Sequence, residues 1–337
     1  MRKIKKHIAI LLALIIGLNI LIFFSLIIGR YAITLEELQA ILWSFFGGSQ
    51  NEAIEKARTV FVQIRLPRVL LACIIGCGLS TAGAAYQGIF QNAMAAPDVL
   101  GASSGAAFGA TLAILNGQSG FGITISAFAF SIGSVCLVYF ISTKASGGKI
   151  LGLVLSGIMI SSLFSAGTSF MKLIADPSNQ LPTITYWLMG SIAGARLKDI
   201  SFVLLPMFLG LFPLILLRWR MNVLAVGDDE AKAMGVNVQA VRLGVIVAAT
   251  LITAASVSVS GIIGWVGLVI PHLARRIVGN NYVHLIPMSM VLGAGFMLIV
   301  DNVSRNLFST EIPLGILTAV IGAPFFLYLI TRKGDSL

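Results

Sequence analysis

Charged side chains are scarce in this chain of 337 residues. Asp, Glu, Lys and Arg together make up 11% of it and apolar residues 57%, whereas soluble domains carry about 25% charged residues. The mean hydropathy is +0.96. So few charges cannot solvate a globule of this length, and the abundance of Leu, Ile, Val and Phe excludes a disordered chain. The composition predicts an all-α polytopic membrane protein.

Residues for covalent chemistry and metal binding are also few. The cysteines Cys73, Cys77 and Cys136 lie in apolar runs without CxxC spacing, and the three histidines are far apart along the chain. This pattern favours neither a disulfide framework nor a zinc site. HExxH is absent, and segment 147–150 lacks the Ser/Thr and the first Gly of a phosphate-binding loop. The sequence therefore predicts no catalytic residues, no metal and no cofactor, so an ATPase would be a separate partner.

Long apolar runs are the main positive feature. A helix needs about 20 apolar residues to cross the hydrocarbon core, and shorter or Gly-interrupted runs are tolerated where other helices shield them. The expected spans, which form a single transmembrane domain over 1–337, are 8–29, 68–90, 100–115, 121–142, 150–171, 200–217, 240–260, 262–278, 284–304 and 313–331.

The charges indicate how these spans are oriented. A basic stretch at 1–7 precedes the first run, no signal-peptidase site follows it, and its charge predicts a cytoplasmic N-terminus. Ten crossings return the C-terminus to the same side. With this topology, 14 of the 23 basic residues fall in cytoplasmic loops. The net charge of +10 is therefore explained by topology, and nucleic acid is not expected as a partner.

Four stretches outside the spans stand out, and one of them, 91–99, is a short polar break between two spans. Residues 30–67 form a polar external segment, and residues 172–199 predict a short external helix plus a loop. Residues 218–241 form the longest internal loop and hold the densest charge.

The internal loop contains a candidate coupling segment. Asp228 opens a run of three acids, which favours the positive N-terminal end of a short helix. Ala231 and Met234 give this helix a small apolar face, and Gly235 predicts its C-terminal cap. A short capped helix suits docking into a groove of a cytosolic partner. An ordinary solvated connector is the alternative.

Arginines mark the external side. Arg65 and Arg68 flank Pro67, which suits the first position of a helix. External positive charge runs against the positive-inside rule, so it indicates docking of an acidic partner or snorkelling to lipid phosphates. Asp301 and Arg305 stand at i and i+4, which predicts an ion pair, and Arg305 can also join the docking arginines.

The span at 150–171 is rich in hydroxyl groups. Polar residues within a membrane line pathways or join helices by hydrogen bonds. None of those in this span is charged, which disfavours a proton- or sodium-coupled secondary transporter. Its hydroxyl residues are Ser156, Ser161, Ser162, Ser165, Thr168 and Ser169.

Several motifs, in order, resemble the FecCD family over about 60–332. These proteins are the membrane permeases of ABC importers for iron-siderophores, haem and cobalamin. The matching stretches include 65–68, 97–106, 187–191, 227–235, 264–275, Asp301 with Arg305, and 313–324.

The resemblance implies a type II ABC importer permease fold in a prokaryotic cytoplasmic membrane. It implies a second permease subunit, identical or a paralogue, and a pathway at the interface between the two. Two cytosolic ATPases carrying ATP and Mg would bind below, and an external substrate-binding protein would deliver the ligand. That ligand would be a metal chelate, with a ferric siderophore favoured over haem, cobalamin or an oxyanion such as molybdate.

The resemblance also assigns roles to particular residues. Those of the ATPase-coupling helix are Gly227, Asp228, Ala231, Met234 and Gly235. Those that meet glutamates of the binding protein are Arg65, Arg68 and Arg305. Those of the pathway and its cytoplasmic gate are Lys149, Ile150, Leu151, Ser161, Ser165 and Thr168.

Overall fold

The computed structural model describes residues 2–29, 31, 33–44, 52–144 and 149–331, and its regular elements within these ranges are all helical. The predicted all-α class is confirmed. The elements are α1 (Arg2–Ile27), α2 (Leu35–Ser44), α3 (Glu52–Thr59), the π-helical stretch η1 (Val60–Arg65), α4 (Leu66–Ile89), α5 (Ala102–Leu115), α6 (Phe121–Lys144), α7 (Lys149–Ile174), α8 (Gln180–Leu188), α9 (Leu197–Val226), α10 (Asp228–Ala233), α11 (Val238–Ser260), α12 (Val266–Val278), α13 (Tyr282–Asn306) and α14 (Leu314–Thr331).

Each of the ten expected spans coincides with a helix. In the described ranges, seven helices are long and apolar enough to cross a membrane by themselves. Three others are shorter: α5 has 14 residues and α12 has 13, and α14 is also short of a full span. Most of α5 is buried among other helices. Such shielding is what allows a short helix to sit beside irregular backbone at membrane depth.

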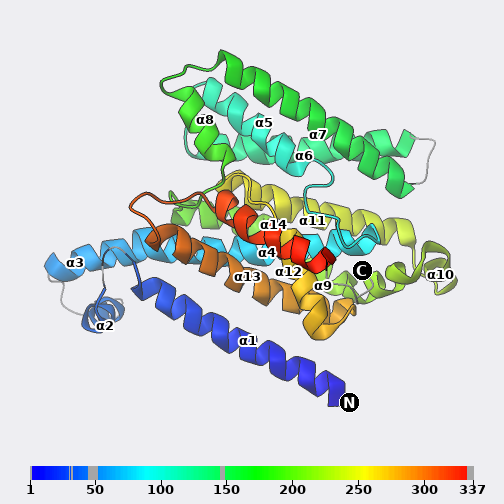
Figure 1. Ribbon diagram of the computed structural model, residues 1–337, viewed down its shortest axis with the longest axis horizontal. Coiled ribbons are helices and arrows are strands. Elements are labelled where there is room, and N and C mark those ends of the chain that lie inside the picture. The colour runs from blue at the N-terminus through cyan, green and yellow to red at the C-terminus, as the bar shows by residue number, and fades with distance from the viewer. Residues whose placement is uncertain (1, 30, 32, 45–51, 145–148, 332–337) are drawn as a thin grey trace.

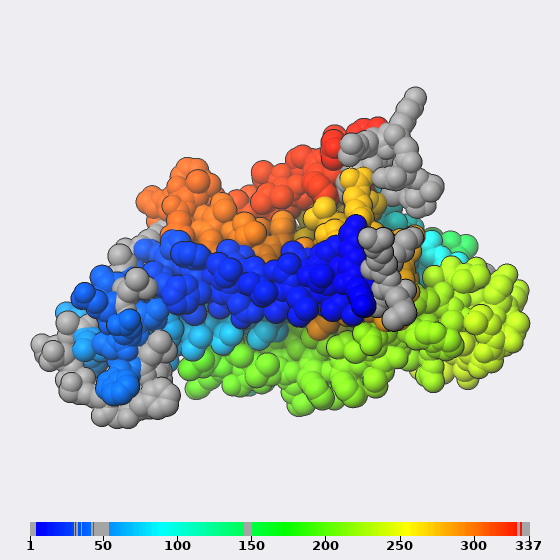
Figure 2. Space-filling model, turned by 90° about the horizontal axis from the view of Figure 1, so that it is seen from below, coloured from blue at the N-terminus to red at the C-terminus, as the bar shows by residue number. Residues whose placement is uncertain are grey.

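The helices form two groups joined by α11. Helices α5, α6 and α7 pack on one another, with α8 against α5, and form the upper group in Figure 1. The other group is built around α4, which contacts α9, α11, α12 and α13. Helix α11 contacts both groups. Helix α1 packs on α13 and lies lengthwise across one face of the molecule (Figure 2).

The two ends of the bundle carry different elements. Helices α2 and α3 lie at one end, and the beginning of α1 and α10 lie at the other (Figure 1). The predicted coupling segment is therefore at the same end as the start of the first span. We call the α2–α3 end the outer end and the α10 end the inner end, in keeping with the expected topology.

Helix α4 touches its neighbours backbone to backbone. A Cβ atom at Gly83 would lie 1.8 Å from the carbonyl oxygen of Gly267 on α12. A Cβ at Gly76 would lie 2.2 Å from the carbonyl oxygen of Gly293 on α13. Glycine pairs of this kind let membrane helices approach closely, where dispersion forces and weak hydrogen bonds are strongest.

Two expected boundaries differ from the structure. Pro67 lies in the first turn of α4, as predicted, but no turn precedes it, because α3, η1 and α4 form one continuous helical path from Glu52 to Ile89. The ring of a proline collides with the carbonyl four residues earlier, and the wider turn of η1, in which the Leu66 N–H donates to the Phe61 carbonyl, gives that ring room. The internal loop is also shorter than 218–241, because α9 runs to Val226 and α11 begins at Val238. Arg218 lies within α9, where its guanidinium donates to the Val283 carbonyl at 3.4 Å, so the charge does not end the helix.

The contact between α4 and α12 generates a prediction. Gly83→Ala should lower the melting temperature strongly, because overpacking a close backbone contact costs about 1–3 kcal/mol or more. Gly133→Ala is the matched control, since nothing lies within 4 Å of a Cβ at that position of α6. Thermal unfolding of both variants in detergent measures the difference. Equal melting temperatures would contradict the close contact.

Candidate functional site

Three arginines and two carboxylates meet at the outer end of α4 and α13. We call Arg65, Arg68, Asp301, Arg305 and Glu311 the external cluster. The Arg68 Nε donates to Asp301 Oδ1 at 2.7 Å, and its Nη1 donates to Glu311 Oε2 at 2.8 Å. The Arg305 Nε lies 3.1 Å from Asp301 Oδ2, which confirms the predicted ion pair. Asp301 is completely buried and bridges the two arginines.

Arg65 has a different set of partners. Its guanidinium donates to the backbone carbonyls of Leu26, Ile27 and Tyr31. The last carbonyls of a helix lack hydrogen-bond donors within the helix and carry a partial negative charge. A guanidinium at this position donates hydrogen bonds to them and also balances that charge. Arg65 therefore holds the outer end of α1 against the start of α4.

The structure brings together the three arginines that the sequence analysis assigned to docking. They line a cavity of about 220 Å³ together with Glu311. Arg65 and Arg68 are each 4% exposed and bonded within the chain, so the snorkelling alternative was wrong. The docking role stays a prediction. The partner role of Glu311 was missed, because 243 residues separate it from Arg68 and no local pattern links them.

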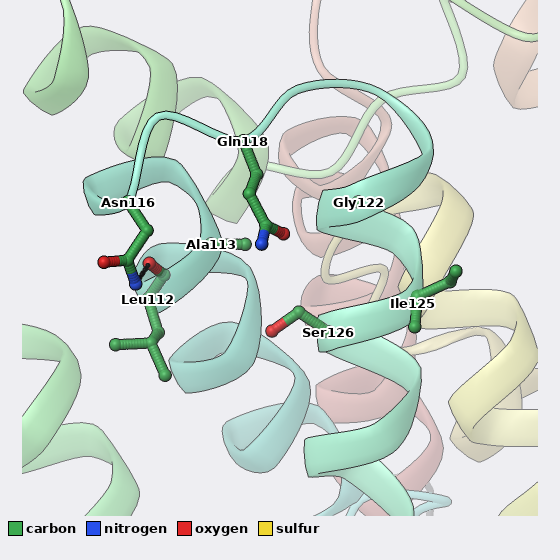
Figure 3. A pocket seen from close by; sticks show the side chains of 7 residues that line it. All are labelled: Leu112, Ala113, Asn116, Gln118, Gly122, Ile125 and Ser126. Atoms are coloured by element: carbon green, nitrogen blue, oxygen red, sulfur yellow. Dashed lines mark hydrogen bonds between the residues drawn. The ribbon is translucent and has the colours of Figure 1, made fainter.

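A second hollow lies at the outer end, between the end of α5 and the start of α6. Its volume is about 390 Å³, and Asn116, Gln118 and Ser126 lie around it (Figure 3). The Asn116 amide donates to the Leu112 carbonyl, and the Ser126 hydroxyl donates to the carbonyl of Gly109. The lining residues carry no charge.

At the inner end, α10 has the predicted C-terminal cap. Gly235 has a φ of +76°. Its N–H donates to the Lys232 carbonyl at 2.9 Å, and the Val236 N–H donates to the Ala231 carbonyl at 2.9 Å. These two bonds form a Schellman motif, in which glycine is favoured at the left-handed position. The cap prediction is confirmed.

The faces of α10 differ from the expectation. Ala231 is completely buried against the chain's own core, so its side chain does not belong to an exposed docking face. Met234 is 61% exposed. Asp228, directly after Gly227, pairs with Arg242 of α11 at 2.8 Å and fixes α10 on its neighbour.

The acidic side of α10 is open to solvent. Asp229 and Lys232 form an exposed ion pair at 2.8 Å. The hydrogen bond and charge of Lys232 lower the pKa of Asp229, so this carboxylate stays ionised at neutral pH. The segment thus presents the apolar side chain of Met234 near the ionised carboxylate of Asp229.

Helix α7 exposes one long face. Ser162, Ser165 and Ser169 are exposed on it, at intervals of three and four residues. At about 100° per residue, these serines share one side of the face. Met159, Leu163 and Phe170 are exposed on the adjoining side. Leu151 and Ile158 are exposed on the same side as the serines, nearer the start of α7. The hydroxyl-bearing part of the open face is therefore confined to the stretch 162–169.

The predicted pathway residues do not all lie on this face. Ser165 is exposed there, whereas Thr168 is buried and bonds the Phe164 carbonyl. Ser161 is half-buried, near Gly101. Ser162 and Ser169 were counted among the hydroxyl residues of this span but were not assigned to the pathway, although their helical spacing from Ser165 places them on the same side.

The gate residues begin α7. Leu151 is exposed and Ile150 is half-buried against the core. Lys149 is the first residue of α7, and its side chain lies outside the described part of the chain. Gate and pathway roles stay predictions.

The family model and the similar proteins match this sequence over most of its length. The sequence model of the FecCD transport family matches residues 15–332. A molybdate import system permease of Haemophilus influenzae is 42% identical over 96% of this chain and 97% of its own. An Fe(3+)-citrate import system permease of Bacillus subtilis is 37% identical over 80% of this chain and 81% of its own. A solved metal-chelate type ABC transporter in an inward-facing conformation matches with a TM-score of 0.85, at 41% identity over 96% and 98% of the two chains.

The buried carboxylate of the external cluster generates a prediction. Asp301→Asn leaves Arg68 and Arg305 without their shared counter-charge, and breaking a buried ion pair costs about 3–5 kcal/mol. We expect a large loss of thermal stability in detergent. Asp229→Asn removes the same charge from the exposed pair on α10 and should shift the melting temperature little. Similar stability of the two variants would contradict the structural role of Asp301.

Proposed function

This chain belongs to the FecCD transport family, and on that premise we propose that it is the permease subunit of an ABC importer for a metal chelate. The solved transporter supports this proposal, because it is 41% identical and superposes over almost the full length. Hydrolysis of ATP belongs to separate cytosolic subunits, and this chain supplies the membrane pathway. The observation that carries the proposal is α10, a capped helix between two spans with an exposed apolar side chain.

The packing offers a route for coupling. Helix α10 contacts α9 and α11, and α11 contacts α4, α5 and α6. Helices α5 and α6 in turn pack against α7. A movement of α10 by an ATPase is therefore passed through directly packed helices to the face that bears the serines. Such transmission needs only rigid elements with two arrangements.

The open face of α7 supports a pathway between two permease subunits. Its apolar side suits packing against a second subunit or lipid, and its hydroxyl side suits a water-filled passage. Uncharged hydroxyl groups hold a passing ligand weakly, which allows release. The second subunit is a second copy of this chain or a paralogue.

The substrate proposal is a ferric chelate. The relative from Bacillus subtilis is named for iron bound to citrate, a chelate of that kind. Molybdate is the second candidate, because the relative named for its import is 42% identical. Metal analysis of the binding protein purified with the transporter separates the two, because one predicts iron and the other molybdenum.

Met234 provides the test of ATPase coupling. Met234→Asp places a charge at the centre of the proposed contact, and we expect loss of the co-purifying ATPase and of ATP-dependent uptake. Met234→Leu is the control, since it keeps the apolar volume and should retain both. Because the side chain is exposed, neither variant should unfold. Retention of the ATPase by Met234→Asp would contradict docking at α10.

Single cysteines on α7 test the pathway. In a background in which the three native cysteines are replaced by alanine, cysteines at Ser162, Ser165 and Ser169 should react with a water-soluble thiol reagent. Reaction requires the thiolate, which forms only where water reaches. Cysteines at Met159, Leu163 and Phe170 are the controls and should react at least several-fold more slowly. Equal rates on both sides would contradict a pathway along the serines.

A further inference from the structure

We propose that Glu311 is an internal occupant of the external cluster that competes for Arg68 with an acidic side chain of the external binding protein. This inference rests on the proposed function, since it concerns the surface on which that protein docks. It assigns to Glu311 the role of weakening docking so that the partner can leave after delivery.

Glu311 is bound to Arg68 through a single shared nitrogen, and not through the two-nitrogen fork of a bidentate pair. The Arg68 Nη1 donates to both carboxylate oxygens of Glu311, at 3.0 and 2.8 Å. The Arg68 side chain is 5% exposed, whereas that of Glu311 is 29% exposed. Asp301, the other carboxylate on Arg68, is completely buried. Glu311 is thus the carboxylate of the cluster that solvent and an incoming partner can reach.

The backbone presents Glu311 to Arg68. Ile312 directly follows Glu311, and its carbonyl accepts a hydrogen bond from the Ser304 hydroxyl at 2.6 Å. The Leu314 N–H donates to the Gly190 carbonyl at 2.8 Å. The segment that carries Glu311 is therefore tied to α13 through Ser304 and, at the start of α14, to the connection between α8 and α9 through Gly190. Its carboxylate is held at the cluster by these anchors.

The positive charges of the external cluster outnumber its negative charges, so a carboxylate of the binding protein can take the place of Glu311. Three arginines face two carboxylates, so the net charge is one positive with Glu311 in place and two positive without it. The cavity of about 220 Å³ is lined by all three arginines and by Glu311. The cavity is therefore the place where an incoming carboxylate would compete with Glu311 for Arg68. A carboxylate of the binding protein that replaces Glu311 forms one ion pair with Arg68 and breaks another. The free energy gained from the new ion pair is therefore largely offset by the loss of the Arg68–Glu311 pair.

Replacement of Glu311 by glutamine tests the competition. Wild-type and Glu311→Gln complexes are placed in nanodiscs, and the binding protein purified with the transporter is the probe, with Kd and dissociation rate measured by interferometry. We expect about two- to fivefold tighter binding through slower dissociation, the range for a partly exposed ion pair. Glu36→Gln is the matched control, because it removes one exposed charge from α2 on the same side and should leave Kd unchanged.

The outcomes separate this inference from the function on which it rests. Equal or weaker binding by Glu311→Gln, with normal docking to the wild type, would overturn the competition alone. No docking to the wild type would contradict the proposed function and the inference with it.

A measurement without the binding protein tests directly whether Glu311 shields the Arg68 guanidinium. Phenylglyoxal modifies accessible guanidinium groups, and mass spectrometry quantifies the product at Arg68. We expect labelling to rise several-fold in Glu311→Gln and to stay at the wild-type level in Glu36→Gln. Unchanged labelling in Glu311→Gln would show that Glu311 does not cover Arg68 and would overturn the proposal.

Discussion

The backbone contact between α4 and α13 is the constraint on which the outer end of the molecule depends. Gly76 touches Gly293, and eight residues further out on each helix Arg68 bonds Asp301. Because the helices are antiparallel, these two pairs are in the same register, about 12 Å apart along the axis. A slip of one residue would separate both pairs at once. The glycine contact therefore places the arginines as much as their own ion pairs do.

The external cluster is better suited to specifying an arrangement than to adding stability. Burying Asp301 between two arginines costs desolvation that their mutual attraction only offsets. Wrong arrangements of α4 and α13 leave buried charges unpaired and are penalised heavily. The same pairing fixes Arg68 beside the cavity that it lines with Glu311. Structure and recognition share the same side chains here.

The inner end of the molecule is stabilised by other contacts than the outer end. Helix α10 is short, and a helix of six residues is not stable by propensity alone. It is held by the Schellman motif at Gly235, the ion pair of Asp228 with Arg242, and the buried side chain of Ala231. These contacts occupy one face of α10 and leave Met234, Asp229 and Glu230 exposed. The segment is thus a rigid projection, which is what a coupling element between two subunits requires.

The sequence predicted much of this, because apolar runs, caps and i,i+4 pairs are local signals. The ten helices, the short helix α8, the cap at Gly235 and the Asp301–Arg305 pair all came from patterns within a few residues. Contacts between distant segments could not be read in this way. Arg68 with Glu311 and Arg65 with the end of α1 depend on how helices pack. The inward side of Ala231 likewise depends on where α11 lies. Helix ends were misplaced where charges were taken as boundaries, at Arg218 and around Pro67.

The central claim is that a separate ATPase drives this chain through α10. Native mass spectrometry of the tagged chain, extracted in mild detergent and assayed for ATP hydrolysis, tests it most directly. The account predicts two permease subunits with two ATPase subunits and hydrolysis that the binding protein stimulates. A homo-oligomer free of any ATPase, with uptake that survives ATP depletion, would contradict it.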